Sequence, residues 1–98
     1  MTIYKQLNGS ELTIALTGRL DTTTAPELEN AIKENIADIT NLVMDFAGLE
    51  YLSSAGLRVI LSAQKTMNKL GEIVIRNVNE TINEVFVITG FIDILTIE

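Results

Sequence analysis

The sequence contains no cysteine and no histidine, and these two absences exclude several kinds of site. Without cysteine there is no disulfide, no thiolate nucleophile and no zinc–thiolate centre, which fits a reducing cytosol. Without histidine a Ser-His-Asp triad is excluded, because a serine nucleophile normally needs this base beside it. We therefore expect a protein that is not an enzyme and that binds no metal or other cofactor.

Basic residues are also scarce, because seven Lys and Arg stand against 13 Asp and Glu, giving a formal net charge of −6. This charge repels phosphate backbones and anionic membranes, so we expect no direct contact with nucleic acid and no membrane association. The sequence also shows no hydrophobic run of transmembrane length and no signal peptide at its start. We expect the protein to be cytoplasmic.

The composition is that of a folded protein, with 47% hydrophobic and 20% charged residues among 98. This balance is far from that of disordered chains. A chain of this length holds one small domain, and no repeat, linker or low-complexity segment divides it. We expect residues 1–98 to form a single α/β domain.

Two strands and a helix are predicted in the first part of the chain. Residues 3–7 and 12–17 flank Asn8-Gly9, a dipeptide that favours a tight hairpin turn. The alternation of apolar residues in the second strand is expected to stop at Gly18–Asp21. Thr24-Ala25-Pro26-Glu27 then has the pattern of a capping box with proline in the first turn. It should begin an amphipathic helix of about three to four turns that ends before Thr40.

Two further strand–helix units are predicted after it. The apolar run 42–46 favours a central strand covered on both faces, followed by a turn at 47–49. A helix starting near Gly56 should bury one face and end at a left-handed Gly71. The buried face of this helix comprises Ile60, Ala63, Met67 and Leu70.

The last part of the chain completes the predicted fold. Residues 73–75 favour an interior strand, Asn79 should cap a third helix that stops at Gly90, and 92–97 suit a short last strand. The element order predicts an N-terminal β-hairpin followed by βα units with right-handed crossovers. The fold class is α/β, with a mixed sheet of four to five strands and about three helices.

Ser53 and Ser54 lie between a predicted strand and a predicted helix, and two roles are open to them. Each can cap the helix, which is the common role of serine at such a position. A phosphate would also be tolerated there, beside free N–H groups and the positive end of the helix dipole. The surrounding residues form neither a nucleophile elbow nor a phosphate-binding loop. Three scattered acids are more typical of solvated surface than of a metal site: Asp21, Asp45 and Glu50.

Two motifs resemble a known family. NLVMDFAGLEYLSSAGLRVIL, at 41–61, and LTGRLDTTTAPELE, at 16–29, resemble the STAS domain family, specifically its single-domain anti-sigma factor antagonists. VFVITGF, at 85–91, is similar to the last helix of that family, so the likeness covers nearly the whole chain. The resemblance implies a STAS-type domain in which a serine at the start of the second helix is phosphorylated.

Aligned on the glycine of the motif, the phosphorylated serine of the family corresponds to Ser54. The usual D-S-[ST]-G is S-S-A-G here, so that Ser53 stands at the aspartate position and is an alternative acceptor. Asp21 matches an acidic residue of the L-x-G-x-L-D loop, which contacts the partner in the family. Arg58 is expected to position the partner or the phosphate, or else to be merely solvated. The resemblance implies a partner-binding surface made of Asp21, Thr22, Thr23, Ser53, Ser54, Gly56, Leu57 and Arg58.

The function implied by the resemblance is partner switching in sigma factor regulation. The unmodified domain would bind an anti-sigma factor that is also a serine kinase, and would thereby free a sigma factor. Phosphorylation would release the partner, and a PP2C-type phosphatase would restore binding. The alternative is a structural STAS subunit of a stress-sensing complex or of a lipid ABC transporter, without phosphorylation, because a fold does not fix a function.

Overall fold

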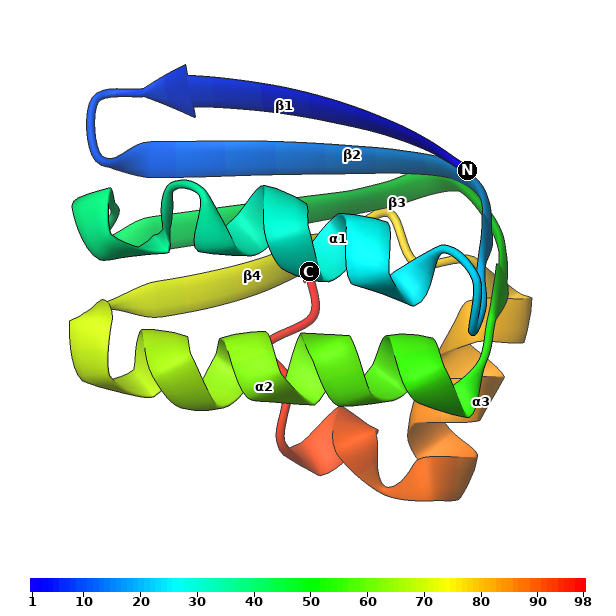
Figure 1. Cartoon of the computed structure of the whole chain (residues 1–98). Coiled ribbons are helices and arrows are strands. Elements are labelled where there is room, and N and C mark those ends of the chain that lie inside the picture. Colours follow the sequence, from blue (N-terminus) through cyan, green and yellow to red (C-terminus); the bar gives the residue numbers. More distant parts are fainter.

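The sheet has four strands in the order β1-β2-β3-β4, as a computed structural model of all 98 residues shows (Figure 1). The strands are β1 (Thr2–Asn8), β2 (Glu11–Leu20), β3 (Asn41–Leu52) and β4 (Glu72–Arg76). β1 and β2 form an antiparallel hairpin, whereas β2, β3 and β4 are mutually parallel. The predicted mixed α/β sheet with an N-terminal hairpin is confirmed.

Three α-helices connect and follow these strands: α1 (Ala25–Lys33), α2 (Ser54–Leu70) and α3 (Glu80–Thr89). Two short 3-10 helices lie at Ile36–Asp38 and Phe91–Asp93. Figure 1 shows α1 and α2 side by side, running in the same direction and starting at the same end of the sheet. No helix is long and apolar enough to pass through a bilayer.

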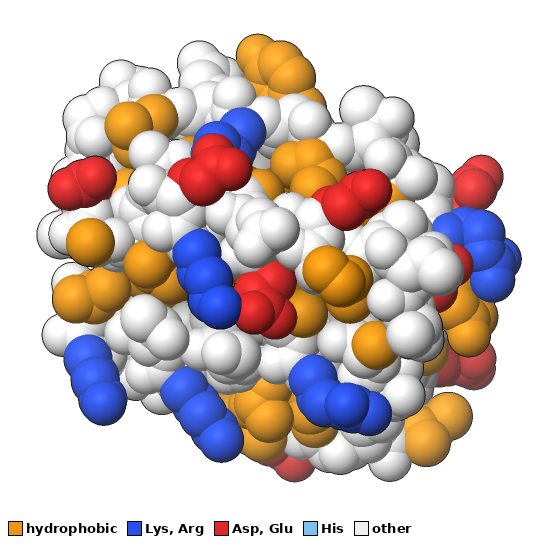
Figure 2. Space-filling view, viewed as in Figure 1, with side chains coloured by type: hydrophobic (Ala, Val, Ile, Leu, Met, Phe, Trp, Pro, Cys, Tyr) orange, Lys and Arg blue, Asp and Glu red, His pale blue; other side chains and the backbone are white.

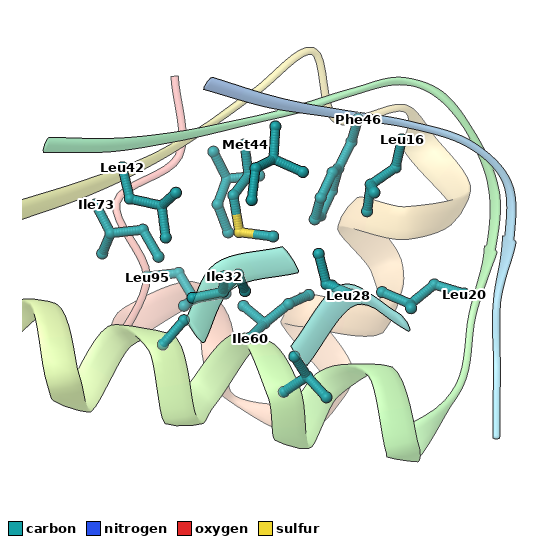
Figure 3. Close-up of a cluster of buried hydrophobic side chains, with 14 of the residues drawn as sticks. Leu16, Leu20, Leu28, Ile32, Leu42, Met44, Phe46, Ile60, Ile73 and Leu95 are labelled. Carbon is teal, nitrogen blue, oxygen red and sulfur yellow. The ribbon is translucent and has the colours of Figure 1, made fainter. Parts of the chain in front are cut away.

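The core lies between the sheet and the helices. Apolar residues at even positions of β2 and β3, from Leu12 to Leu16 and from Leu42 to Phe46, are buried on one face of the sheet. They join a single cluster of 23 buried residues that includes Leu28 of α1, Ile60 of α2 and Phe86 of α3. Figure 3 shows part of this cluster, with Leu28, Met44 and Ile60 among the side chains that converge between the strands and the helices. Burial of each large apolar side chain stabilises the fold by about 1.5–3 kcal/mol.

The prediction that β3 is covered on both faces was wrong. Val43 on the opposite face is buried, but it lies outside the core cluster. Its neighbours on that face are partly exposed, as Ala15, Asp45 and Val74 show. The apolar run 42–44 is therefore compatible with a sheet that has helices on one face only. Val43 points to the other face, where it lies between the neighbouring strands β2 and β4.

The predicted turn at 47–49 is a pair of irregularities inside β3. Ala15 pairs with Asp45 but Thr17 pairs with Gly48, and a second shift follows where Arg19 pairs with Tyr51. Each shift places one extra residue in β3, as in a β-bulge. Buried residues consequently recur every third position, at Phe46, Leu49 and Leu52, a spacing that a regular strand cannot produce.

Other boundaries also differ from those predicted. β2 continues through Gly18, which adopts a φ of 96°, to Leu20, and both Leu16 and Leu20 are buried. α1 ends at Lys33, so the helix is shorter than predicted, and Ile36 lies in the 3-10 turn that follows. Thr24 is the first capping residue of α1, but its side chain makes no cap hydrogen bond, so the predicted capping box is not formed.

The C-terminal elements were predicted in part. Asn79 caps α3, where its Oδ1 accepts the Ile82 N–H at 2.9 Å, and Gly90 ends this helix in the left-handed conformation. β4 is an edge strand instead of an interior one. The expected last strand is reduced to a single bridge between Ile75 and Ile97. Leu70, expected in the core, is 41% exposed.

Gly71 ends α2 for a steric reason. Its φ of 164° is extended backbone, so the predicted left-handed conformation was wrong. A Cβ at this position would overlap the Thr40 carbonyl group, because the start of β3 passes directly beside the end of α2. Any larger residue would push these two elements apart.

We expect Gly71→Ala to lower the free energy of unfolding by about 1–3 kcal/mol, because its Cβ would meet backbone that cannot turn away. Urea unfolding followed by circular dichroism measures this loss. Gly9→Ala is the comparison, because its Cβ would meet nothing and only the left-handed φ of 63° is strained, at about 1 kcal/mol. Equal stability of Gly71→Ala and the unmodified protein would contradict the expected overlap.

Candidate functional site

The candidate site lies where the parallel strands β2 and β3 end. Leu20 pairs with Leu52, and the Ser53 N–H donates to the Leu20 carbonyl oxygen at 2.9 Å. Asp21 and Ser53 directly follow the ends of these two strands, so the loop before α1 and the start of α2 are held together. Figure 1 shows both helices beginning at this end of the sheet.

Gly56 and Leu57 were expected to contact a partner, but they face the protein interior. Gly56 is buried, and a Cβ there would lie 2.7 Å from Leu20 Cγ. Leu57 is only 7% exposed and belongs to the core cluster. These residues therefore seat the first turn of α2 on the end of β2, and the outward-facing residues of the predicted set remain available for contact.

Asp21 organises the loop before α1. Its Oδ1 accepts the Thr23 hydroxyl at 2.8 Å and the backbone N–H groups of Thr23 and Thr24 at 3.0 and 3.2 Å. These hydrogen bonds, led by that of the Thr23 hydroxyl, lower the pKa of Asp21 below its ordinary value. Asp21 is therefore a carboxylate at neutral pH, and its loop is preorganised.

The Thr24 hydroxyl bridges backbone groups of this loop instead of capping α1. It accepts the Asp21 N–H at 2.8 Å and donates to the Arg19 carbonyl oxygen at 2.8 Å. Thr22 and Thr23 are exposed at the tip of the loop. The loop therefore exposes two threonines, and the side chains of Asp21 and Thr24 hold its backbone in place by hydrogen bonds.

Arg19 and Tyr51 form a contact that was not found from the sequence. The Arg19 guanidinium lies 4.1 Å from the centre of the Tyr51 ring, in cation–π geometry, and its Nε is 3.9 Å from Asp21 Oδ2. Tyr51 is 40% exposed. Arg19 and Tyr51 are partners across the parallel strands, and this pairing depends on the bulges in β3. The sequence alone does not reveal the bulges, so the contact could not be predicted from it.

The two serines have different roles in the structure. Ser53 is the capping residue of α2, half-buried, with its Oγ accepting the Gly56 N–H at 3.3 Å. Ser54 is the first residue of the helix, is exposed, and makes no side-chain hydrogen bond. In the structure Ser53 is the cap of α2, and Ser54 has the free hydroxyl.

Arg58 lies one turn beyond Ser54 on the same side of α2 and is exposed, with no ion-pair partner. It borders a hollow of about 260 Å³ between the starts of α1 and α2, which Thr22 and Pro26 line from the other side. Residues four positions apart on a helix are neighbours, so Arg58 can approach a group attached to Ser54.

The acids considered for a metal site are separate. No group of three or more acidic side chains is close enough to hold a metal ion, and Asp45 lies away from Asp21 on the open face of the sheet. Asp45 Oδ1 accepts the Asn77 side-chain amide at 3.0 Å and the Ala47 N–H at 2.9 Å. These bonds lower the pKa of Asp45, with the Asn77 amide as the largest cause.

Comparison with known proteins identifies the family. The model of the STAS domain matches residues 2–98. The chain belongs to the STAS domain family.

Two relatives of this chain are named as anti-sigma factor antagonists. The chain is 33% identical over 88 residues to BtrV of Bordetella bronchiseptica, provisionally named an anti-sigma factor antagonist, across 88% of this chain and 76% of BtrV. It is 39% identical over 60 residues to the anti-sigma-F factor antagonist RsfB of Mycobacterium tuberculosis, across 60% of this chain. That match spans about half of the relative, 47% of RsfB.

Solved structures confirm the STAS fold. An anti-sigma factor antagonist from Mycobacterium paratuberculosis superposes with a TM-score of 0.88 at 24% identity, over 98% of this chain and 83% of the other. Unphosphorylated SpoIIAA superposes with a TM-score of 0.86 at 19% identity, over 99% of this chain and 88% of SpoIIAA. At these sequence identities the superpositions establish the fold alone. The function has to be argued from the residues of the site.

The division of roles between the serines predicts unequal effects on stability. We expect Ser53→Ala to lower the free energy of unfolding by about 0.5–1 kcal/mol, because the Gly56 N–H loses its acceptor. Ser54→Ala should stay within about 0.5 kcal/mol, because its hydroxyl makes no bond to lose. Urea unfolding of both variants measures the difference, and a larger loss for Ser54→Ala would reverse the assignment.

The Asp21 network predicts a measurable pKa change. We expect Thr23→Val to raise the pKa of the Asp21 carboxyl towards its ordinary value of about 3.9, as followed by carboxyl-detected NMR titration. Thr22→Val is the control, because Thr22 makes no hydrogen bond to Asp21 and should leave its pKa unchanged.

The sign of the accompanying stability change follows from linkage. A lowered pKa in the folded state stabilises the fold above about pH 4, and this stabilisation is lost as the pH falls through the folded-state pKa. In Thr23→Val the acid-induced loss should therefore be smaller than in the unmodified protein. A pKa of Asp21 that is the same in Thr23→Val and Thr22→Val would show that the hydroxyl bond does not hold the carboxylate.

Proposed function

We propose that this STAS domain is a cytoplasmic, non-enzymatic anti-sigma factor antagonist, switched by phosphorylation of Ser54. The observation that carries the proposal is the exposed, unbonded hydroxyl of Ser54 at the first position of α2, beside the preorganised Asp21 loop. The names of the relatives BtrV and RsfB support an anti-sigma factor as the partner. The unmodified domain binds this partner and thereby frees a sigma factor.

The partner docks on the outward-facing residues of the site. Thr22 and Thr23 at the loop tip, Ser54 and Arg58 on α2 share one end of the molecule and are exposed. Asp21 holds the loop with its Oδ1 while its other oxygen stays near Arg19. Because hydrogen bonds fix the backbone of the loop before docking, little conformational entropy is lost when the partner binds.

Phosphorylation acts on this surface through charge. A phosphoserine at position 54 adds about −1.5 to −2 charges beside the Asp21 carboxylate. The free N–H groups and the dipole of α2 stabilise the phosphate within the domain, so the fold persists. A partner surface that fits the unmodified site meets repulsion and a desolvation cost, and about 3 kcal/mol of these lowers affinity more than a hundredfold.

The acceptor is Ser54 and not Ser53. Ser53 is half-buried and its Oγ already accepts the Gly56 N–H, whereas the Ser54 hydroxyl is exposed and unbonded. Ser54 can be modified without breaking any bond of the fold. The anti-sigma factor acts as the serine kinase, and a PP2C-type phosphatase returns the domain to its binding state.

One observation favours a second function. The S-S-A-G motif places neutral Ser53 where the antagonists carry aspartate, and the cap of α2 is satisfied without that charge. A structural STAS subunit of a stress-sensing complex or of a lipid ABC transporter needs the fold but no kinase. In that case the partner binds Ser54-modified and unmodified protein alike.

The decisive experiment incubates the protein with the candidate anti-sigma factor and ATP, and locates added phosphate by mass spectrometry. We expect phosphate on Ser54, its loss in Ser54→Ala, and its retention in Ser53→Ala. Absence of phosphate from all three proteins, with the partner still bound, would favour the structural subunit.

A charge-mimicking variant tests the switch separately. Ser54→Asp should retain the helical circular dichroism spectrum but bind the unmodified partner more weakly, by tenfold or more as measured calorimetrically. Thr81→Asp is the matched control, because it places the same charge at an exposed position in the first turn of another helix, α3. Equal weakening in both variants would assign the effect to net charge instead of to Ser54.

A further inference from the structure

The cations of α2 differ from all other cations of the protein. Four of the seven Lys and Arg residues lie 2.7–3.9 Å from a carboxylate, and none of these four is in α2. The remaining three, Arg58, Lys65 and Lys69, have no acidic partner, and α2 contains no acidic residue among its 17. In a protein of net charge −6, every unpaired cation is therefore on one helix.

These three cations form one line, which we call the basic stripe of α2. Together with Ser62, they are spaced by four, three and four residues, so they share one side of the helix, and all are exposed. The stripe extends about 16 Å, from one turn beyond Ser54 to the last turn of α2. Figure 2 shows Lys and Arg side chains in a row over α2.

A shallow apolar groove runs beside the basic stripe. A hollow of about 200 Å³ lies between α1 and α2, where Ser62 belongs both to its wall and to the face of the stripe. Its polar rim includes Thr66 and the Lys33–Glu29 ion pair. The apolar residues that line it are Ile32, Ile36, Val59 and Ala63.

We propose that the basic stripe of α2 and this groove dock an acidic amphipathic helix of a partner protein. Carboxylates spaced by seven and four residues on that helix would face Arg58, Lys65 and Lys69, while an apolar side chain beside them enters the groove. The complementary charges select the partner and its orientation, and the apolar contact adds affinity. This docking shares Arg58 with the proposed anti-sigma factor surface, but it goes beyond the proposed function because it requires neither Ser54 nor phosphorylation.

Nucleic acids and membranes fit this surface less well than a protein helix. Three cations on a protein of net charge −6 give too little neutralisation of a phosphate backbone for stable binding. A helix that lies on a membrane presents apolar residues towards the acyl chains. On α2 the apolar Val59 and Ala63 are recessed between the helices, Leu61 is partly buried, and only Leu70 at the end of the helix is an exposed large apolar residue.

The test uses a synthetic probe and the whole 98-residue chain. The probe is a capped, alanine-based helical peptide with glutamates at i, i+4, i+7 and i+11 and leucines on the adjacent side. Titrated into ¹⁵N-labelled protein, it should shift amide resonances of α2 and α1 and leave those of β1 and α3 unchanged. Binding should weaken with added salt, because exposed charges are screened.

Charge-matched variants make the result specific. Lys65→Gln/Lys69→Gln should weaken binding about tenfold, in line with two lost surface ion pairs. Lys5→Gln/Arg76→Gln removes the same charge from cations paired elsewhere and should bind like the unmodified protein. The same peptide with glutamine in place of glutamate should not bind.

Several results would overturn the proposal. They are an absence of peptide binding, shifts scattered over the whole molecule, or equal weakening by the two double variants. Tighter binding of phosphatidylglycerol vesicles or of a DNA duplex than of the peptide, lost in Lys65→Gln/Lys69→Gln, would assign the basic stripe to a membrane or to nucleic acid instead.

Discussion

The parallel pairing of Leu20 with Leu52 is the contact on which the site depends. It brings the ends of β2 and β3 together, and the Ser53 N–H extends the pairing by one more hydrogen bond to Leu20. Gly56 allows α2 to start directly against Leu20, because no Cβ intervenes. A loop rigidified by a carboxylate and a helix N-terminus thereby become neighbours, although 30 residues separate them in the sequence.

Local signals were enough to predict much of the fold. The hairpin at Asn8-Gly9 and the cap at Asn79 were found because each depends on a few adjacent residues. The irregular course of β3 could not be predicted, because a bulge is defined by the partner strand, and Ala47-Gly48 has the composition of a turn. The failed capping box at Thr24 has the same origin, since the hydroxyl bonds instead to Arg19 and Asp21.

The site was predictable to the level of position but not of role. The sequence placed two serines at a helix start, and only their environments separated the half-buried cap, Ser53, from the free hydroxyl, Ser54. The family resemblance placed Leu57 on the partner-binding surface, but the helical period directs its side chain into the core. The stacking of Arg19 on Tyr51 depends on cross-strand register, which the chain does not encode locally.

The two surplus residues of β3 make the site depend on the length of the chain as well as on its chemistry. A single deletion between Asp45 and Tyr51 would remove one of the two bulges, so the spacing of the inward residues Phe46, Leu49 and Leu52 would change. A chain one residue shorter within this segment would therefore bury a different set of side chains just before the start of α2.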